Sequence, residues 1–306
     1  MAKITVIGSL IMDNVATMER YPEAGESIMG TSINYYPGGK GANQCVAIAR
    51  LGGDCEMIGM VGNDENGKIF KNLLKEENIK SDNVFVCDKP TGIAQIQINN
   101  EGQNRICFIP SSNFEFNFNH IDLIDKIIKE TSLVVLQLEL RLEIVEEIIK
   151  RAHKYGVKIL LNPAPAMNID KEVLKYVDYI TPNEFELSSL TNLPVETEPQ
   201  IIKASQKLLS YGCKNVIATL GSKGAIIANN KITKLIPSYK VKAIDTVGAG
   251  DSFNGALAVS IIEGKELEEA VKFANAMGAL TVQKSGAIPS LHTRKEVEDF
   301  LNGIIN

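Results

Sequence analysis

The sequence predicts an α/β fold in which a mainly parallel central sheet is covered by helices on both faces. From about residue 120 onward, short strands that are apolar throughout alternate with amphipathic helices, the pattern of right-handed crossovers between parallel strands. Two glycine-rich stretches, at residues 37–41 and 248–250, each precede a helix rich in small residues. Loops at the carboxyl ends of such strands are where open α/β sheets bind ligands.

Composition excludes several classes of protein. The chain has 306 residues, is 44% hydrophobic and carries a net charge of −5 with acids and bases interspersed. No basic block indicates nucleic acid or an anionic membrane surface, and no segment approaches ~18 apolar residues, so we expect a cytoplasmic protein without either partner. The 5 cysteines form no C-x-x-C pair, and we expect them to be small buried side chains rather than nucleophiles or zinc ligands. With 3 histidines, all in or beside polar helical stretches, we expect no catalytic histidine.

The first part of the chain predicts one buried strand and a small separate sheet. Residues 3–7 form a short β-rich run that ends in Gly8 and Ser9, and Asp13 lies just beyond it. Asp13 is either a surface loop residue or a residue that grips a polar substrate. Residues 14–36 predict two or three strands, and residues 91–109 predict a hairpin with its turn at 99–102. A small sheet joined to a larger body by few crossings suits a lid or a dimer surface.

The rest of the chain alternates regularly. We expect strands at 55–61, 133–138, 157–161, 177–181 and 215–219, a second hairpin over 225–236, and helices at 45–51, 66–78, 121–130, 142–155, 171–176, 184–190, 200–211, 252–263, 267–282 and 294–301. Polar residues end three of these strands: Glu139, Asn162 and the run from Asn183 to Glu186. Several polar strand ends in succession mark one side of the sheet as the working face.

The late glycine stretch combines an anion-binding loop with a carboxylate. Gly248 to Gly250 predict a loop that opens a helix at about Asp251, and bare amides at a helix N-terminus attract a phosphate. A carboxylate there would repel that phosphate unless Asp251 takes a proton from a hydroxyl that attacks it. The alternative is that Asp251 only caps its helix, and both roles can coexist.

The early glycine stretch, from Pro37 to Gln44, again allows close backbone approach, with Lys40 and Asn43 as donors. It is not a Walker A loop, which requires G-x-x-x-x-G-K-[ST]. A solvated turn before a helix is the alternative.

Together, Gly38-Gly39-Lys40-Gly41-Ala42-Asn43, Asn183-x-x-Glu186 and Asp245-Thr246-Val247-Gly248-Ala249-Gly250-Asp251 resemble, in content and order, the motifs of the ribokinase (PfkB-type) carbohydrate kinases. The resemblance runs the full length of the chain. It implies one PfkB-type domain over residues 1–306, with a ribokinase-like three-layer α/β/α sandwich and a small β-sheet lid from about 14–36 and 91–110. It also implies ATP, Mg²⁺ and K⁺ as cofactors and a homodimer through the lid sheet, which the alternation at Ile96 and Ile98 permits.

The resemblance assigns a role to each matching residue. Asp251 is the expected base, and the amides of Gly248, Ala249 and Gly250 are the expected anion hole. The sugar site comprises Ile11, Asp13, Gly39, Lys40, Gly41, Asn43, Glu139 and Asp251. The nucleotide site comprises Asn183, Thr219, Leu220, Gly221, Ser222, Lys223, Gly224, Gly250 and Asn275. Glu186 holds Mg²⁺ through water, and the K⁺ site comprises Asp245, Val247, Thr281, Lys284, Gly286 and Ser290, several through backbone carbonyls.

The implied activity is transfer of the γ-phosphate of ATP to the 5-hydroxyl of D-ribose or 2-deoxy-D-ribose. Ribokinases carry Gly-Ser-x-Asn-x-Asp after the first strand, whereas Ile11 stands here at the asparagine position. Burying the 2-hydroxyl of ribose against an apolar side chain costs roughly 1–3 kcal/mol, which favours 2-deoxyribose unless water or another residue serves that hydroxyl. An apolar pocket excludes an added hydroxyl by only about 10²-fold, so both sugars stay open.

Two alternatives remain from the sequence. A fructokinase or another hexose or nucleoside kinase would use the same glycine motifs. An inactive sugar-binding or regulatory module could use the same fold, although the presence of Asp251, Asn183 and Glu186 argues against it. A Rossmann dehydrogenase is excluded because no G-x-G-x-x-G follows the first strand.

Overall fold

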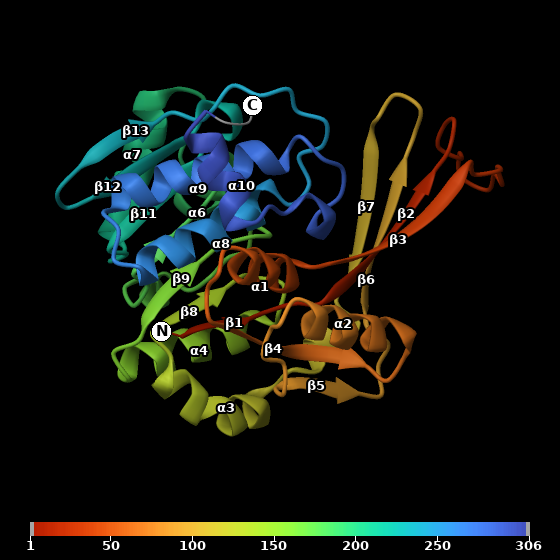
Figure 1. Ribbon diagram of the computed structural model, residues 1–306, viewed down its shortest axis with the longest axis horizontal. Coiled ribbons are helices and arrows are strands. Elements are labelled where there is room, and N and C mark those ends of the chain that lie inside the picture. The colour runs from red at the N-terminus through yellow and green to blue at the C-terminus, as the bar shows by residue number, and fades with distance from the viewer. Residues whose placement is uncertain (1–2, 304–306) are drawn as a thin grey trace.

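The computed structural model describes residues 3–303 and contains two sheets. The large sheet has 9 strands in the order β13-β12-β11-β10-β9-β8-β1-β4-β5, and the small one has 4 in the order β3-β2-β6-β7. Figure 1 shows the small sheet standing out from one side of the body. The α/β architecture predicted from the sequence is confirmed.

The large sheet is parallel except at one end. Its strands are β1 (Ile4–Ile7), β4 (Cys55–Gly62), β5 (Val84–Cys87), β8 (Leu133–Leu136), β9 (Lys158–Leu161), β10 (Tyr179–Ile180), β11 (Asn215–Thr219), β12 (Ala225–Asn229) and β13 (Thr233–Ile236). Strand β12 is antiparallel to both of its neighbours, β11 and β13, as the predicted second hairpin requires. The edge strand β5 was not predicted from the sequence.

Helices cover both faces of this sheet. One face carries α1 (Lys40–Arg50), α2 (Glu65–Glu76), α8 (Ala249–Ile262), α9 (Leu267–Thr281) and α10 (Arg294–Leu301). The other carries α3 (Phe118–Glu130), α4 (Leu142–Lys154), α5 (Lys171–Leu174), α6 (Glu184–Thr191) and α7 (Glu198–Ser210). Alternate residues of each strand enter different cores: in β8, Val135 belongs to the first core and Val134 to the second. Three layers follow from strands that are apolar on both faces.

The small sheet is formed by the segments predicted to make a lid, and we keep that name for it. It consists of β2 (Ile11–Thr17), β3 (Ser32–Gly38), β6 (Gly92–Ile98) and β7 (Asn104–Ile109). Strand β2 pairs parallel with β6, whereas its pairing with β3 is antiparallel. Asp13 therefore lies within a strand, and the alternative that it is a surface loop residue is wrong, because the connection after β1 spans only residues 8–10. Side chains alternate along a strand, so Ile11 and Asp13 share one face.

Helices α1 and α8 cross at close range. A Cβ at Gly255 of α8 would lie 2.5 Å from Ala47 Cβ and 3.2 Å from the Gln44 carbonyl oxygen, both on α1. Only a glycine allows this approach. The crossing brings the N-terminal ends of both helices, which carry the two glycine motifs, to the same side of the sheet.

Three expectations need correction or comment. Helix α8 begins at Ala249 with Gly248 as its N-cap, two residues before the predicted start, because Gly248 alone takes the left-handed conformation (φ 79°) that ends the loop. Cys45, Cys55 and Cys213 are buried as expected, but Cys107 on β7 is exposed, since the lid has no second layer over it. Within residues 3–303, no helix is long and apolar enough to cross a membrane.

Candidate active site

The carboxylate of Asp251 lies in the first turn of α8 and is held from α1. Its Oδ2 accepts a hydrogen bond from Asn43 Nδ2 at 2.8 Å, and its Oδ1 accepts one from Gln44 Nε2 at 3.0 Å. Both oxygens thus face α1, so the expectation that Asp251 also caps its own helix is wrong. The cap position, Gly248, offers no side chain.

The residues expected to hold the sugar gather beside it, around Glu139. This side chain follows β8 and accepts hydrogen bonds from Ser9 Oγ and from the Lys40 amide, the latter at 2.9 Å. Gly39 takes φ 85°, and a Cβ at Gly41 would lie 2.5 Å from the Ser9 amide nitrogen. The early glycines therefore bring the start of α1 against the β1–β2 connection and place Lys40 and Glu139 together.

Asp13 faces this group from the lid. Burial, and after it the carboxylates of Glu139 and Asp251, raise the pKa of Asp13 to about 7. Burial also raises the pKa of Glu139. Burial alone would lower the pKa of Lys40, but the surrounding carboxylates, with Asp251 first among them, raise it above its usual value. Lys40 forms no direct ion pair with any described residue, so its ammonium group is available to a ligand.

The start of α8 presents amides to open space. Gly250 is exposed, and a Cβ built on it would meet nothing within 4 Å. The Ala249 amide points to the Thr246 carbonyl oxygen at 3.3 Å, a long contact that an anion can replace. An anion at this helix N-terminus would lie next to the carboxylate of Asp251.

Asn183 and Glu186 form a closed pair at the start of α6. Asn183 donates from its amide nitrogen and its Nδ2 to the two Glu186 oxygens, at 2.9 Å each, and the Glu186 amide donates back to Asn183 Oδ1 at 2.8 Å. Burial raises the pKa of Glu186. Each carboxylate oxygen keeps a free lone pair, which fits contact with a metal ion through water.

The profile of the pfkB family of carbohydrate kinases matches residues 1–294. The chain belongs to this family. A ribokinase of Bacillus subtilis is 38% identical to it over 307 residues, or 99% of this chain and 100% of the relative. A deoxyribokinase of Salmonella typhi is 34% identical over 305 residues, or 98% of each chain. The structure of Arabidopsis thaliana ribokinase complexed with ribose and ATP superposes with a TM-score of 0.92 at 34% identity, over 98% of each chain. The kinase therefore has the ribokinase-like fold that its motifs predict.

Most of the residues expected to bind the nucleotide lie at the end of β11 and on α9. Thr219 forms a β-bridge with Asn183 where β11 ends, and Gly221–Lys223 continue as an exposed 3₁₀ turn. Asn275 of α9 donates from Nδ2 to the carbonyl oxygens of Ile236 and Pro237, at 3.1 and 3.2 Å. The side-chain nitrogen of Asn275 thus holds the chain at the end of β13, and only the side-chain oxygen of Asn275 remains for a ligand.

The residues expected to bind K⁺ in the kinase form a loop-on-loop contact. Asp245 Oδ1 accepts from the Val247 amide at 3.0 Å, and Asp245 Oδ2 accepts from the Gly286 amide at 2.9 Å. Ser290 and Thr281 donate their hydroxyls to backbone carbonyls. No group of three or more His, Cys, Asp or Glu side chains suited to a metal occurs in the described part of the chain. Asp245 is the one carboxylate among the residues expected to bind K⁺, and a single carboxylate suits a weakly hydrated monovalent cation better than a divalent one.

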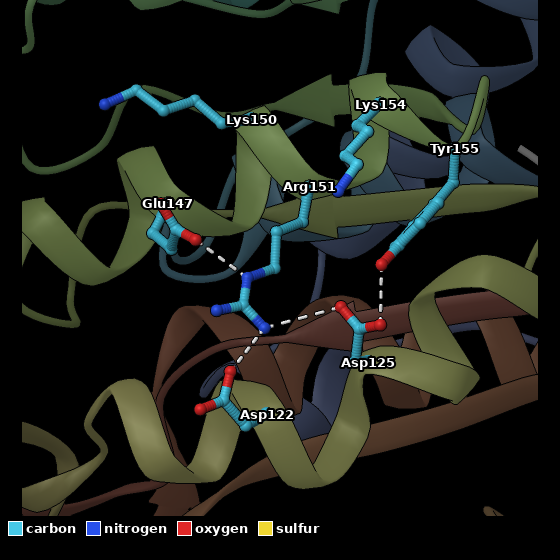
Figure 2. Close-up of a pocket in the computed structure, with 7 residues that line it drawn as sticks. All are labelled: Asp122, Asp125, Glu147, Lys150, Arg151, Lys154 and Tyr155. Atoms are coloured by element: carbon cyan, nitrogen blue, oxygen red, sulfur yellow. Dashed lines mark hydrogen bonds and ion pairs between the residues drawn. The ribbon is translucent and has the colours of Figure 1, made fainter.

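A charged groove of about 450 Å³ between α3 and α4 is separate from this site (Figure 2). Arg151 contacts Asp122 at 2.6 Å, Glu147 at 2.7 Å and Asp125 at 3.4 Å, and Tyr155 donates to Asp125 at 2.6 Å. None of the residues predicted from the motifs lines it. These charges satisfy one another and tie α3 to α4.

Sequence reasoning missed several buried polar residues behind Asp251. They are Ser9, Gln44, Gln137, Thr181 and Asn254, all at most 1% exposed. Asn162 was noted only as the end of a strand. The available signal was a polar side chain directly after an apolar strand, or, for Gln44, directly after a predicted ligand. That signal does not say which residues meet.

Proposed function

We propose that this kinase transfers the γ-phosphate of ATP to the 5-hydroxyl of D-ribose or 2-deoxy-D-ribose, with Asp251 as the base. One observation carries the proposal: the Asp251 carboxylate, at the amide-rich start of α8, is hydrogen-bonded at 2.8 Å to Asn43 in the sugar group. An acceptor held by Asn43 and an anion held by α8 would meet at this carboxylate. The ribokinase and deoxyribokinase relatives support the two acceptors.

The reaction follows from this arrangement. Asp13, Lys40, Asn43 and Glu139, with the backbone at Gly39 and Gly41, orient the sugar. Asp251 accepts the proton of the sugar 5-hydroxyl while the oxygen of that hydroxyl forms a bond to the γ-phosphorus. The bond between the γ-phosphorus and the bridging oxygen breaks, which releases ADP. The amides of Gly248, Ala249 and Gly250 stabilise the negative charge on the transferring group.

The residues of the kinase also fit the expected cations. Glu186, with Asn183 beside it, would hold Mg²⁺ through water, and Mg²⁺ supplies charge neutralisation of the phosphates when bound. Asp245 and the carbonyls of Val247, Thr281, Lys284, Gly286 and Ser290 would hold K⁺. Because Asp245 also joins Val247 to Gly286, K⁺ there would fix the loop that precedes the anion hole. Thr219 to Gly224 and Asn275 would hold the nucleotide.

Ile11 bears on the choice of sugar. Its side chain is only 2% exposed and lies on the lid face that carries Asp13. Its backbone nitrogen would be 2.8 Å from a Cβ at Gly39, so it lies against the sugar group. An apolar residue there offers nothing to the 2-hydroxyl of ribose. The ratio of kcat/KM for ribose to that for 2-deoxyribose decides between them, and a strong ribose preference would remove the argument from Ile11.

The function is tested by an ADP-release assay over pentoses, hexoses and nucleosides, with and without K⁺. We expect turnover with ribose or 2-deoxyribose, and a loss of at least ~10²-fold in kcat for Asp251→Ala while ATP binding persists. Near-full turnover by Asp251→Ala would refute the mechanism. Turnover only with fructose or a nucleoside would refute the acceptor.

We also propose a homodimer through the lid. Val15, Ile96 and Ile106 form a cross-strand row on the lid face that carries Asp13, and Ile106 is 59% exposed. A second copy would cover this row. Ile106→Asp should then shift the mass measured by analytical ultracentrifugation from dimer to monomer. The cytoplasmic location expected from the sequence stays a prediction.

A further inference from the structure

A group of buried amide side chains is linked by hydrogen bonds to the Asp251 carboxylate. Gln44 of α1 is fully buried and donates both protons of its Nε2 group: to Asp251 Oδ1 at 3.0 Å and to Asn162 Oδ1 at 3.1 Å. Asn43, its neighbour in sequence, donates to the other oxygen of Asp251. Two consecutive side chains of α1 thus hold the two oxygens of one carboxylate on α8.

The orientation of the Gln44 amide group is fixed from both ends. Gln137 Nε2 donates to Gln44 Oε1 at 2.7 Å, and Asn162 Nδ2 donates to the Thr181 carbonyl oxygen at 3.2 Å. Turning the Gln44 amide over would place its oxygen against the carboxylate of Asp251 and against Asn162 Oδ1, three acceptors without a donor. Only the observed orientation gives both polar atoms of Gln44 their hydrogen-bond partners, and it presents N–H to Asp251.

The backbone makes room for this arrangement. A Cβ at Gly8, at the end of β1, would lie 2.1 Å from Gln137 Oε1, so only glycine allows Gln137 to lie there. Gln137 itself is fully buried, on the strand end that leads to Glu139. The chain from Gln137 through Gln44 to Asp251 therefore connects the middle of the sheet to the base.

We propose that Gln44 is a positioning residue for phosphoryl transfer, which holds Asp251 Oδ1 so that Oδ2 faces the acceptor hydroxyl. This rests on the proposed function, in which Asp251 is the base. Gln44 is fully buried, and its Nε2 and Oε1 are already hydrogen-bonded within the protein, so it is not available to the sugar. Asn43 is 5% exposed, and its Oδ1 has no partner among the described residues, so it can accept a hydrogen bond from the sugar. Asn43 and Gln44 therefore have different roles: Asn43 contacts both the acceptor and the base, whereas Gln44 acts only through the base.

Loss of this hydrogen bond should affect turnover rather than binding. Without Gln44 Nε2, the carboxylate can rotate about its Cβ–Cγ bond, and a displacement near 1 Å of a reacting group costs on the order of 10²-fold in rate. We expect Gln44→Met, which keeps the length and removes the donor, to lower kcat by about 10- to 100-fold with little change in the sugar KM or in ATP binding. Asn43→Ala should instead raise the sugar KM as well.

A double-mutant cycle separates positioning from a structural defect. If Gln44 acts through the base, Gln44→Met should have almost no further effect on the residual turnover of Asp251→Ala. Thr5→Val is the matched control: it removes a buried hydrogen bond of 2.8 Å to Thr131 at the opposite end of β1, and should lower stability without changing kcat. An equal loss of rate in both backgrounds, or an unchanged kcat for Gln44→Met, would overturn the inference.

A second variant keeps the shape and reverses the chemistry. Gln44→Glu places a carboxyl group beside Asp251, which can donate a hydrogen bond only when it is protonated. Its activity relative to the wild type should therefore rise as the pH is lowered from 8.5 to 6; a pH-independent ratio would also contradict the inference. Should Asp251→Ala retain turnover, the proposed function fails, whereas dependence on Asp251 with additive Gln44 effects refutes only the positioning role.

Discussion

Asp13 should make the ligand-free kinase less stable as the pH rises. Its pKa is raised from 3.8 to about 7 by burial first and then by the charges of Glu139 and Asp251. Between these pH values the folded protein keeps a proton that the unfolded chain has released. Since the folded state then binds more protons, its free energy of unfolding falls as the pH rises through this window.

The size of the effect follows from the same values. A change of one in a pKa is equivalent to about 1.36 kcal/mol. The rise in the pKa of Asp13 from 3.8 to about 7 therefore lowers the free energy of unfolding by at most about 4 kcal/mol once the pH is above 7. Partial exposure and shared titration with Glu139 reduce it. Asp13→Asn cannot ionise, so it should be more stable than the wild type at pH 8, by up to about 3 kcal/mol more than at pH 5. It should also raise the sugar KM, because an amide cannot accept as a carboxylate does.

The assay is urea unfolding of both proteins from pH 5 to pH 8 without ligands, with Asp88→Asn as the control for a lost surface charge. Adding sugar should stabilise the wild type more than the variant, because the sugar hydroxyls donate to the carboxylate. If the difference in free energy of unfolding between Asp13→Asn and the wild type were the same at pH 5 and pH 8, or if the variant were no more stable, ionisation of Asp13 would not destabilise the folded protein. That result would refute the reasoning.

Three further changes test other parts of the site. Gly41→Ala places a Cβ 2.5 Å from the Ser9 amide nitrogen and should lower both Tm and kcat/KM, and an unchanged Tm would show that α1 can shift. Ile11→Asn should raise the ratio of kcat/KM for ribose to that for 2-deoxyribose by roughly 10-fold or more. The reason is that a hydrogen bond between neutral groups contributes about 1 kcal/mol, and a buried hydroxyl without a partner costs more than that. An unchanged ratio would mean that residue 11 does not contact the 2-hydroxyl. Glu186→Gln keeps the two backbone hydrogen bonds of the cap with Asn183, but it removes the charge and the acceptor for Asn183 Nδ2. It should raise the Mg²⁺ concentration needed for half-maximal rate and leave the sugar KM unchanged. A normal Mg²⁺ titration would exclude Glu186 from the metal site.

Most of the fold could be predicted because inner strands of the large sheet, such as β1 and β8, are apolar on both faces. Strand β5 escaped prediction because its four residues, Val84–Cys87, lie at the sheet edge without a turn signal that separates a strand from a loop. The start of α8 was misplaced because the sequence shows three small residues, Gly248 to Gly250, but not which one has a positive φ.

The glycine motifs predicted where the candidate site lies. The buried amide side chains next to Asp251 could not be predicted, because they contact one another across long distances in the sequence. Gln44 meets Gln137 across 93 positions and Asn162 across 118. Nothing local to these residues indicates that pairing, because it arises only once β8, β9 and α1 lie side by side. A buried glutamine is informative only when its partners are known.

The glycine contact between α1 and α8 has a consequence for how such a kinase can change its substrate. With Gly255 against Ala47, α1 and α8, which we propose hold the sugar and the base, have no free space between them at this contact, so neither can move toward the other to admit a larger acceptor. Any new acceptor has to be accommodated on the opposite wall, formed by Ile11, Asp13 and the rest of the lid. Libraries for altered sugar preference should therefore vary the lid strands and leave α1 and α8 unchanged. Helix α8 carries the proposed base and α1 positions it, whereas the lid carries Ile11 and Asp13, which are proposed to contact the acceptor.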